Sequence, residues 1–220
     1  MAVNEVEREQ AILDAAVELL LRVGYQKLTM GDVADAVALH RGLVYLRFKS
    51  KDDLVEAAGR RELDRYAEQW SEALRADPAG GTVASVYRAM VRALRSLPFA
   101  AAIVARDEAV FGKYLRKPGT LFDRLKDVGT VGFLAGMQEV GAMRADIDAH
   151  AVAFILDALT PALRHTFSHA DEAAPATDAV VDALAELLEL GLTPPAGADL
   201  AAGKSYLLAA LTRTRATFSA

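Results

Sequence analysis

Apolar residues near the amino end recur at steps of three and four, which is the spacing of one face of a helix. Ile12, Ala16, Leu19 and Val23 lie on this face, and Gly24 follows directly. A glycine just after the last periodic residue is typical of a helix end because glycine adopts the left-handed backbone at little cost. The pattern predicts a first helix that ends near Gly24.

Polar residues mark the starts of the next helices. Thr29 and Asp32 have the spacing of a capping box, which predicts a short second helix. A third short helix is expected over roughly 40–47. Ser50 is the expected N-cap of a long connecting helix at about 52–75, because a serine side chain there accepts a hydrogen bond from the first turn.

The remainder of the chain alternates proline and glycine breaks with segments of helical length and period. Alanine is abundant, and alternation typical of strands is absent, so the expected fold class is all-α. We expect an amino-terminal domain of three helices at 1–50 and a larger domain at 51–220. In the larger domain, helices at about 148–167 and 177–191 are candidates for pairing two chains. The tail at 192–220 contains apolar residues that could form a further helix. Whether this tail is ordered stays open.

Bulk composition narrows the class of protein. Hydrophobic residues make up 53%, the formal net charge is −5, and there is no cysteine. The lack of cysteine excludes disulfides, thiolate nucleophiles and cysteine metal sites. No run of 18 uncharged apolar residues occurs, and the charged start has no apolar signal core, so we expect a cytoplasmic protein without membrane contact.

A basic cluster interrupts this acidic chain. Residues 38–51, ALHRGLVYLRFKSK, contain Arg41, Arg47, Lys49 and Lys51 and no acidic residue. Electrostatic attraction depends on charges within about 8–10 Å in physiological salt, so a local cluster matters more than net charge. Two short helices with a basic second helix are typical of a helix-turn-helix DNA reader. A plain solvated face is the alternative interpretation of such a run.

The third helix should also have a buried side. Val44 and Phe48 are expected to face the core together with Leu39. If Val44 and Phe48 point inward, the helical period leaves Leu43 and Leu46 at least partly exposed.

At residues 12–58 these features resemble the amino-terminal domain of the TetR family of transcriptional regulators. The resemblance comes from ILDAA with EL in the first helix, GY after it, the threonine before the second helix and VA within that helix. It continues with Gly42, Val44, Tyr45 and Phe48 and then SKDDL. The matches follow one uninterrupted order over about the first quarter of the chain. GAMRADIDAHAVA at 141–153 is similar to the entry into the penultimate, dimer-forming helix of many members.

The resemblance implies DNA-contacting roles for particular residues. His40, Arg41 and Leu43 are expected to face bases, and Gly42 to allow close backbone approach. The residues expected to face phosphates are Thr29, Tyr45, Arg47 and Lys51, and the charge pattern adds Lys49. Several positions depart from the family pattern. Ala38 replaces a turn glycine, Leu43 a threonine, Leu46 an aromatic residue and Arg47 a histidine, so an operator sequence cannot be transferred.

A regulator of this kind needs a second copy, because one short helix reads too few base pairs. The helices at 148–167 and 177–191 are apolar nearly all round, which indicates burial on several sides. The expected homodimer contacts are Val152, Ile155, Leu156, Leu159, Val180, Leu184, Leu187 and Leu188. A wholly intramolecular core is the alternative.

The resemblance also implies a small-molecule cavity in the larger domain. Large apolar side chains would line such a cavity. The candidates are Tyr66, Trp70, Phe99, Ile103, Phe111, Phe122, Phe133, Met137 and Phe154. The expected function is a repressor that a small apolar or aromatic molecule releases from a palindromic operator in double-stranded DNA, and activation in place of repression stays open.

Candidate catalytic chemistry is sparse. His165 and His169, in HTFSH, have the spacing of a metal pair, but Phe167 stands where zinc proteases have glutamate. We expect no metal, no cofactor and no enzymatic activity. An all-α small-molecule binding protein or enzyme that does not bind DNA stays the alternative.

Overall fold

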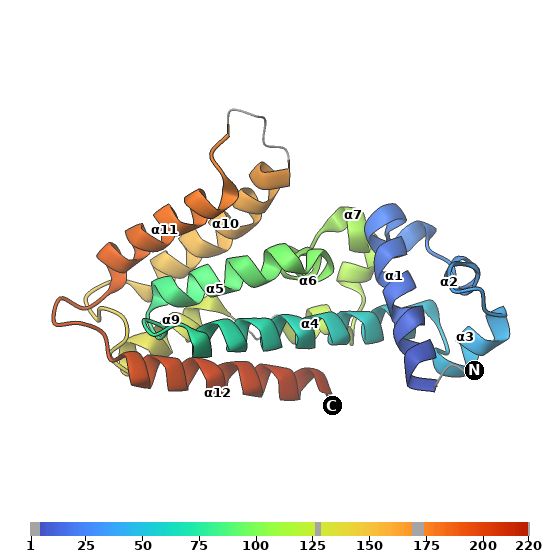
Figure 1. The fold of residues 1–220 in the computed structure, drawn as a ribbon, viewed down its shortest axis with the longest axis horizontal. Coiled ribbons are helices and arrows are strands. Elements are labelled where there is room, and N and C mark those ends of the chain that lie inside the picture. Colours follow the sequence, from blue (N-terminus) through green and yellow to red (C-terminus); the bar gives the residue numbers. More distant parts are fainter. Residues whose placement is uncertain (1–4, 126–128, 169–173, 220) are drawn as a thin grey trace. The chain divides into compact units, whose positions relative to one another are not determined.

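The computed structural model describes residues 5–125, 129–168 and 174–219, apart from the side chains of 164–168 and 217–219. Helices and the turns between them make up this part of the chain, and no strand occurs in it. The predicted all-α fold is confirmed. Figure 1 follows the helices along the chain.

Two compact units divide the chain. The first takes the residues up to Arg65 together with Leu97–Leu125, and the second takes Tyr66–Ser96 and the residues after Leu125. The segment 97–125 therefore packs in the same unit as the amino-terminal helices. The functional boundary expected at residue 50 stays a prediction.

The first unit holds the three amino-terminal helices, the first part of α4 and a run of short helices. Their bounds are α1 Glu5–Lys27, α2 Met30–Ala36, α3 Arg41–Arg47, α4 Lys51–Ala76, α6 Pro98–Val104, α7 Glu108–Phe111, the 3₁₀ helix η1 Gly112–Arg116 and α8 Leu121–Arg124. The long helix α4 contributes residues to both units, because the division falls after Arg65.

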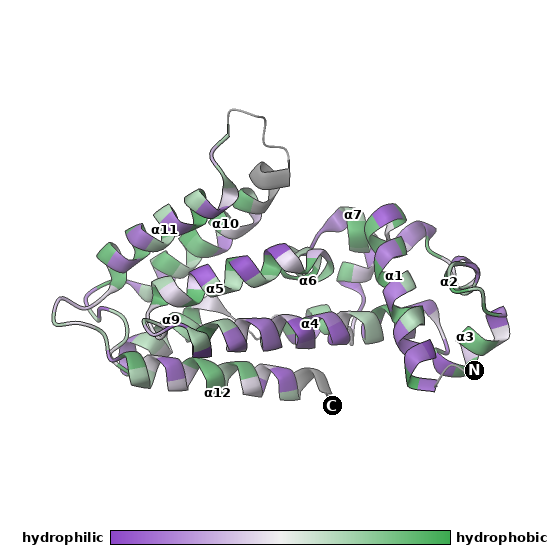
Figure 2. Ribbon diagram, viewed as in Figure 1, coloured by the Kyte–Doolittle hydropathy of each residue, from purple (hydrophilic) through white to green (hydrophobic). Residues whose placement is uncertain are grey.

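The second unit holds the end of α4 and the longer helices of the carboxyl-terminal part. Their bounds are α5 Val83–Ser96, α9 Thr130–Glu139, α10 Ala149–Ser168, α11 Thr177–Leu192 and α12 Leu200–Ser219. The helices expected at 148–167 and 177–191 correspond to α10 and α11. The tail is helical in α12, where Leu207 and Leu211 are buried. Figure 2 shows hydrophobic positions along α10 and α11.

Gly24 interrupts α1 as the sequence predicts. Its φ of 76° lies in the left-handed region, and the backbone there is not helical, although helix assignment continues to Lys27. A Cβ at this position would lie 2.5 Å from the carbonyl oxygen of Ala109. Glycine is therefore needed both for the backbone turn and for the close approach of α7. The turn places Tyr25 in the core of the first unit.

Aromatic rings fill the centre of the first unit. The ring centroid of Phe111 lies 5.3 Å from that of Phe99 and 4.9 Å from that of Phe122, and Tyr114 lies 5.1 Å from Tyr25. All five side chains are buried. Such ring pairs add stability beyond the burial of their apolar area. This core packs the helices α6, α7 and α8 against α1.

Candidate nucleic-acid interface

The start of α2 is held by the predicted capping box. The Thr29 hydroxyl accepts a hydrogen bond from the Asp32 N–H at 3.2 Å, and Asp32 accepts one from the Thr29 N–H at 3.0 Å. Two N–H groups that a helix start leaves unpaired are satisfied in this way. Thr29 is exposed, and within the capping box its hydroxyl acts only as an acceptor. The hydroxyl proton can therefore still be donated to a phosphate oxygen.

The turn between α2 and α3 passes through Ala38. Its φ of 51° is left-handed, which costs an alanine about 1 kcal/mol relative to glycine. The Leu39 N–H donates to the Ala34 carbonyl at 2.9 Å, and the Ala38 N–H donates to Asp35 at 3.2 Å. These bonds close the end of α2. The turn that the family builds with glycine therefore forms here with alanine.

His40 is the N-cap of α3. Its Nδ1 accepts a hydrogen bond from the Gly42 N–H at 3.1 Å. Since Nδ1 is the acceptor, a neutral His40 carries its proton on Nε2, which makes that nitrogen a donor. A Cβ at Gly42 would lie 3.2 Å from Nδ1, so glycine leaves room for this cap.

The two faces of α3 differ as the period predicts. Val44 and Phe48 are buried, with Val44 fully shielded, whereas Leu43 is 38% and Leu46 80% exposed. The prediction for these four residues is confirmed. Leu39 is half-buried. The inward residues fix the helix to the first unit, and its outer face is presented to solvent.

Arg41 and Tyr45 form a pair on the surface of α3. The Arg41 guanidinium donates to the Tyr45 hydroxyl at 3.0 Å and lies 5.2 Å from the ring centroid. One turn of helix separates the two, so the contact is local. Both side chains are exposed and face the same side of the helix.

Arg47 is engaged by carboxylates of α1. Its guanidinium lies 2.5 Å from Glu5 and 3.6 Å from Glu9. Both glutamates are more exposed than Arg47, so water and salt weaken the attraction. A phosphate contact by Arg47 would exchange these partners for DNA.

The two lysines at the end of the basic stretch differ. Lys49 is exposed, and its backbone N–H donates to Asp53 at 3.0 Å. The Lys51 ammonium donates to the carbonyls of Tyr25 at 2.7 Å and Leu28 at 2.9 Å, and burial lowers its pKa. Two of its three donors therefore stabilise the turn after α1, and a phosphate contact by Lys51 stays a prediction.

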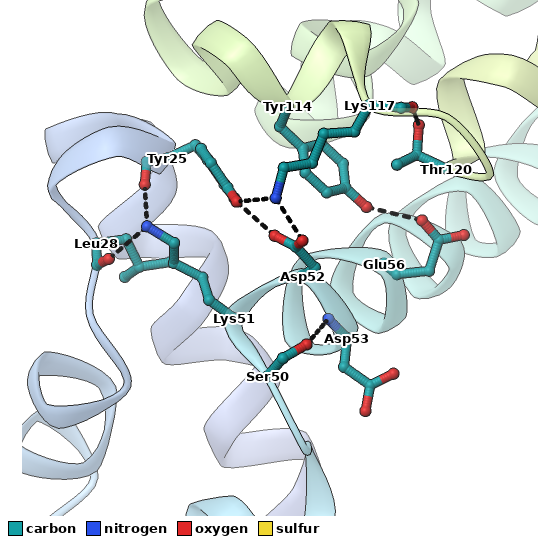
Figure 3. A network of polar contacts seen from close by, with 10 residues as sticks. All are labelled: Tyr25, Leu28, Ser50, Lys51, Asp52, Asp53, Glu56, Tyr114, Lys117 and Thr120. Carbon is teal, nitrogen blue, oxygen red and sulfur yellow. Dashed lines mark hydrogen bonds and ion pairs between the residues drawn. The ribbon is translucent and has the colours of Figure 1, made fainter.

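A polar network joins the first turn of α4 to the segment after η1 (Figure 3). The Tyr25 hydroxyl donates to Asp52, and the Lys117 ammonium donates to Asp52 at 2.5 Å and to Tyr25 at 2.9 Å. The Ser50 hydroxyl accepts from the Asp53 N–H at 3.1 Å, as expected for the N-cap of α4. Sequence reasoning missed the network because Lys117 lies far along the chain from both partners and carries no motif.

Glu56 is the second centre of this network. It accepts hydrogen bonds from the Tyr114 hydroxyl at 2.8 Å, the Leu121 N–H at 3.0 Å and the Arg124 guanidinium. Burial and the nearby Glu56 carboxylate raise the pKa of Tyr114, which keeps its hydroxyl protonated as a donor. Figure 3 shows the bond from Tyr114 to Glu56. With the bonds from Leu121 and Arg124, one carboxylate holds η1 and α8 to α4.

The ligand-pocket candidates divide between the two units. Phe99, Ile103, Phe111 and Phe122 belong to the packed core of the first unit. In the second unit Tyr66 stacks on Trp70 with centroids 5.6 Å apart. The Trp70 indole nitrogen is buried without a hydrogen-bond partner among the described atoms.

The remaining candidates of the second unit differ in burial. Met137 is buried, and Phe133 packs against the same core. Phe154 is 75% exposed and lies outside that core. A ligand contact stays a prediction for all nine candidates.

The dimer candidates on α10 and α11 also differ in exposure. Leu156 is buried in its own unit, Ile155 and Leu187 are exposed, and the rest are half-buried. An apolar groove of about 370 Å³ lies between the two helices. Its lining residues are Leu159, Leu163, Pro175, Ala179, Val180, Ala183, Leu184 and Leu187. Phe154 on α10 and Leu190 on α11 are also exposed apolar residues.

Other chemistry is limited in the part of the chain that the structure describes. That part brings no three histidine or carboxylate side chains together as metal ligands, and none of its helices is long and apolar enough to span a bilayer. The side chain of His165 and the whole of His169 lie outside the described residues, so the histidine pair is not placed.

This arrangement is typical of a helix-turn-helix DNA-binding protein. It consists of a capped helix, a closed turn, and a second helix with a buried inner face and a basic outer face. Residues 12–58 match the model of bacterial regulatory proteins of the tetR family. The amino-terminal part of the chain therefore matches a TetR-family DNA-binding domain.

Solved structures of similar fold extend over most of the chain. The regulator FadR of Bacillus subtilis, solved with stearoyl-CoA, has a TM-score of 0.59 at 18% identity, covering 81% of this chain and 96% of its own. A Rhodococcus sp. protein described as a TetR-family transcriptional regulator reaches 0.60 at 24% identity, covering 84% and 98%.

A third structure comes from Saccharomonospora viridis, where a protein described as a transcriptional regulator was solved with choline. It has a TM-score of 0.61 at 20% identity and covers 86% of this chain and 98% of its own. At these identities the likeness shows the fold. Among curated protein sequences none matches the chain significantly.

Proposed function

We propose that the protein is a homodimeric repressor whose two α3 helices enter successive major grooves of a palindromic operator. In such dimers the reading helices lie about 34–36 Å apart. The observation that carries the proposal is α3 itself, which is locked by Val44 and Phe48 and presents Arg41, Tyr45 and Lys49 outward. We assign no enzymatic reaction to the protein. A regulator that binds DNA in this way would act in the cytoplasm.

Individual contacts follow from the geometry of α2 and α3. His40 and Arg41 stand at the start of α3, which is the end that meets base edges in this motif. Arg41 has the planar fork that fits guanine O6 and N7, and it would leave Tyr45 to do so. The residues assigned to phosphates are Thr29, Tyr45, Arg47 and Lys49, with Gly42 allowing close approach.

The second copy is proposed to cover α10 and α11. Ile155, Leu187 and the groove between the helices form an apolar surface, and monomeric proteins rarely expose such continuous patches. Phe154 and Leu190, which are exposed on the same two helices, are further candidates for this interface. A symmetric dimer through it would bury the same residues of both chains.

A small apolar or aromatic ligand is proposed to bind in the second unit beside Tyr66 and Trp70. The support is the buried Trp70 N–H, because a ligand acceptor would satisfy a donor that otherwise loses a hydrogen bond. Proteins of similar fold have been solved with stearoyl-CoA and with choline. The ligand would lower operator affinity by favouring another conformer, and only to the extent that it binds the two conformers differently. The long helix α4, which carries residues of both units, is the proposed connection.

Selection of DNA fragments tests the proposal. Wild-type protein is mixed with fragmented genomic DNA at low salt, bound fragments are sequenced, and binding to the enriched site is measured at several salt concentrations. We expect a palindromic site and an affinity that falls steeply with salt, because phosphate contacts release counterions. Arg41→Glu is expected to weaken binding by about a hundredfold, from the loss of a bidentate base contact and charge repulsion.

Arg116→Glu provides the matched control. Arg116 is an exposed arginine on η1, and its reversal changes the net charge by the same amount. This variant should keep most of the affinity, and both variants should keep wild-type circular dichroism. The proposal is wrong if no fragment is enriched or if the two reversals weaken binding equally.

A further inference from the structure

The outermost point of α3 is apolar. Leu46 follows Val44 by two residues, about 200° around the helix, so it lies opposite the buried side. It is 80% exposed, and Leu43 on the adjoining side is 38% exposed. Figure 2 shows hydrophobic positions on α3 beside polar ones. The surface that the proposed function directs at DNA therefore has two leucines at its centre.

The charges around these leucines favour an anionic partner. Single exposed leucines are common and need no partner by themselves. Here Arg41 precedes them and Arg47 and Lys49 follow, in a stretch of 14 residues, 38–51, that holds no carboxylate. This surface fits a polyanion that carries small apolar groups between its charges, and duplex DNA is such a polymer.

In the major groove the apolar group is the C5-methyl of thymine. The other base edges present donors and acceptors, and a leucine against them would leave those groups without a partner. We propose that Leu43 and Leu46 select the operator half-site by contact with thymine methyl groups. The inference rests on the proposed function and adds its specificity-determining residues.

Neighbouring polar side chains strengthen this assignment. His40 Nδ1 caps α3, Arg41 is bonded to Tyr45, and Arg47 is paired with Glu5. Each must give up a partner within the chain, or use a second donor, to reach DNA. The leucines have no such bond to break and are held by the rigid helix, so their contacts need no rearrangement.

Deoxyuridine substitution isolates the methyl group. In the selected operator each thymine is replaced in turn by deoxyuridine, which keeps every hydrogen-bonding group and lacks only the methyl. We expect about fourfold weaker binding for each methyl contacted, because burial of one such group contributes that much. Replacement in both half-sites together should weaken binding by on the order of tenfold.

Variants assign the contact to residues. Leu46→Ala and Leu43→Ala should each bind the thymine and deoxyuridine operators equally at the position that the leucine reads. Leu21→Ala is the matched control, because Leu21 on α1 is 39% exposed, like Leu43. It should discriminate as well as wild type. Unfolding temperatures of the leucine variants should stay near wild type, since neither side chain is in the core.

Three outcomes would overturn the inference. The first is equal binding of wild type to both operators at every thymine, and the second is an undiminished deoxyuridine effect in both leucine variants. The third is a changed oligomeric state of Leu46→Ala in sedimentation, which would mean that the leucines cover a protein surface. Failure to enrich any DNA would instead refute the proposed function, so the two failures are distinct.

Discussion

The Lys117 ammonium donates to the Asp52 carboxylate at 2.5 Å, which joins the segment after η1 to the first turn of α4. Both groups also contact the Tyr25 hydroxyl, directly after the break in α1. Three parts of the first unit therefore meet at one ion pair. This contact is one of several that hold the start of α4 within the first unit.

Loss of Lys117 should change the stability of the protein in acid. Burial alone would raise the pKa of Asp52, but hydrogen bonds from Lys117 and Tyr25 outweigh it and hold the pKa below its ordinary value of 3.8. Such a group stabilises the fold above about pH 4, and the stabilisation is lost as the pH falls through the folded pKa. We expect Lys117→Met to lose about 0.5–1 kcal/mol at pH 7, as partly exposed ion pairs do.

Denaturant unfolding at several pH values measures this effect. The difference between wild type and Lys117→Met should shrink as the pH falls from about 4 towards 2. Lys113→Met is the control, because Lys113 is an exposed lysine of the neighbouring helix η1. It should follow the wild-type pH profile, and a pH-independent deficit in Lys117→Met would contradict the account.

Removal of the Glu56 carboxylate should destabilise the first unit more than removal of one of its donors. Glu56→Ala removes one carboxylate that accepts hydrogen bonds from Tyr114, Arg124 and the Leu121 N–H, so a loss of about 2–4 kcal/mol is expected. Tyr114→Phe removes one bond and should cost about 1 kcal/mol. Denaturant unfolding compares the two, and equal losses would refute the central role of Glu56.

Neutral residues at Glu5 and Glu9 should strengthen DNA binding. Arg47 must leave these carboxylates to reach a phosphate, and partly exposed pairs of this kind contribute about 0.2–1 kcal/mol. The variant Glu5→Gln with Glu9→Gln should therefore bind about two- to fivefold more tightly at low salt, with a smaller gain at high salt.

Glu18→Gln is the charge control for that comparison. Glu18 also lies on α1 but pairs with Arg22. Each single change at Glu5 or Glu9 should raise affinity more than this control does. Equal gains would show that general charge, and not the pairing of Arg47, sets the affinity.

A charge on the exposed face of α11 should separate the proposed dimer. Leu187→Asp places a carboxylate in the apolar surface, and an unpaired buried charge costs about 3 kcal/mol or more. The dissociation constant in sedimentation should rise more than a hundredfold. Val131→Asp changes an exposed apolar residue of α9 and should stay dimeric. A Leu187→Asp variant that remains a dimer would refute this interface.

Features that depend on a few neighbouring residues could be read from the sequence. The Thr29–Asp32 box, the break at Gly24 and the inward side of α3 at Val44 and Phe48 all formed as predicted. Caps, turns and helical faces involve groups within one or two turns of the chain. The short-range hydrogen bonds and the 3.6-residue period that create them are therefore present in the sequence itself.

Tertiary structure alone decided which distant groups meet. Nothing near Lys51 indicates that its ammonium bonds to the Tyr25 carbonyl, nor near Lys117 that it meets Asp52. Hydrophobicity likewise marks Phe111 and Phe154 equally, yet the first is core and the second is exposed. Partners far apart in sequence are chosen by the path of the whole chain and by the competition of all apolar surfaces for burial, which no local pattern records.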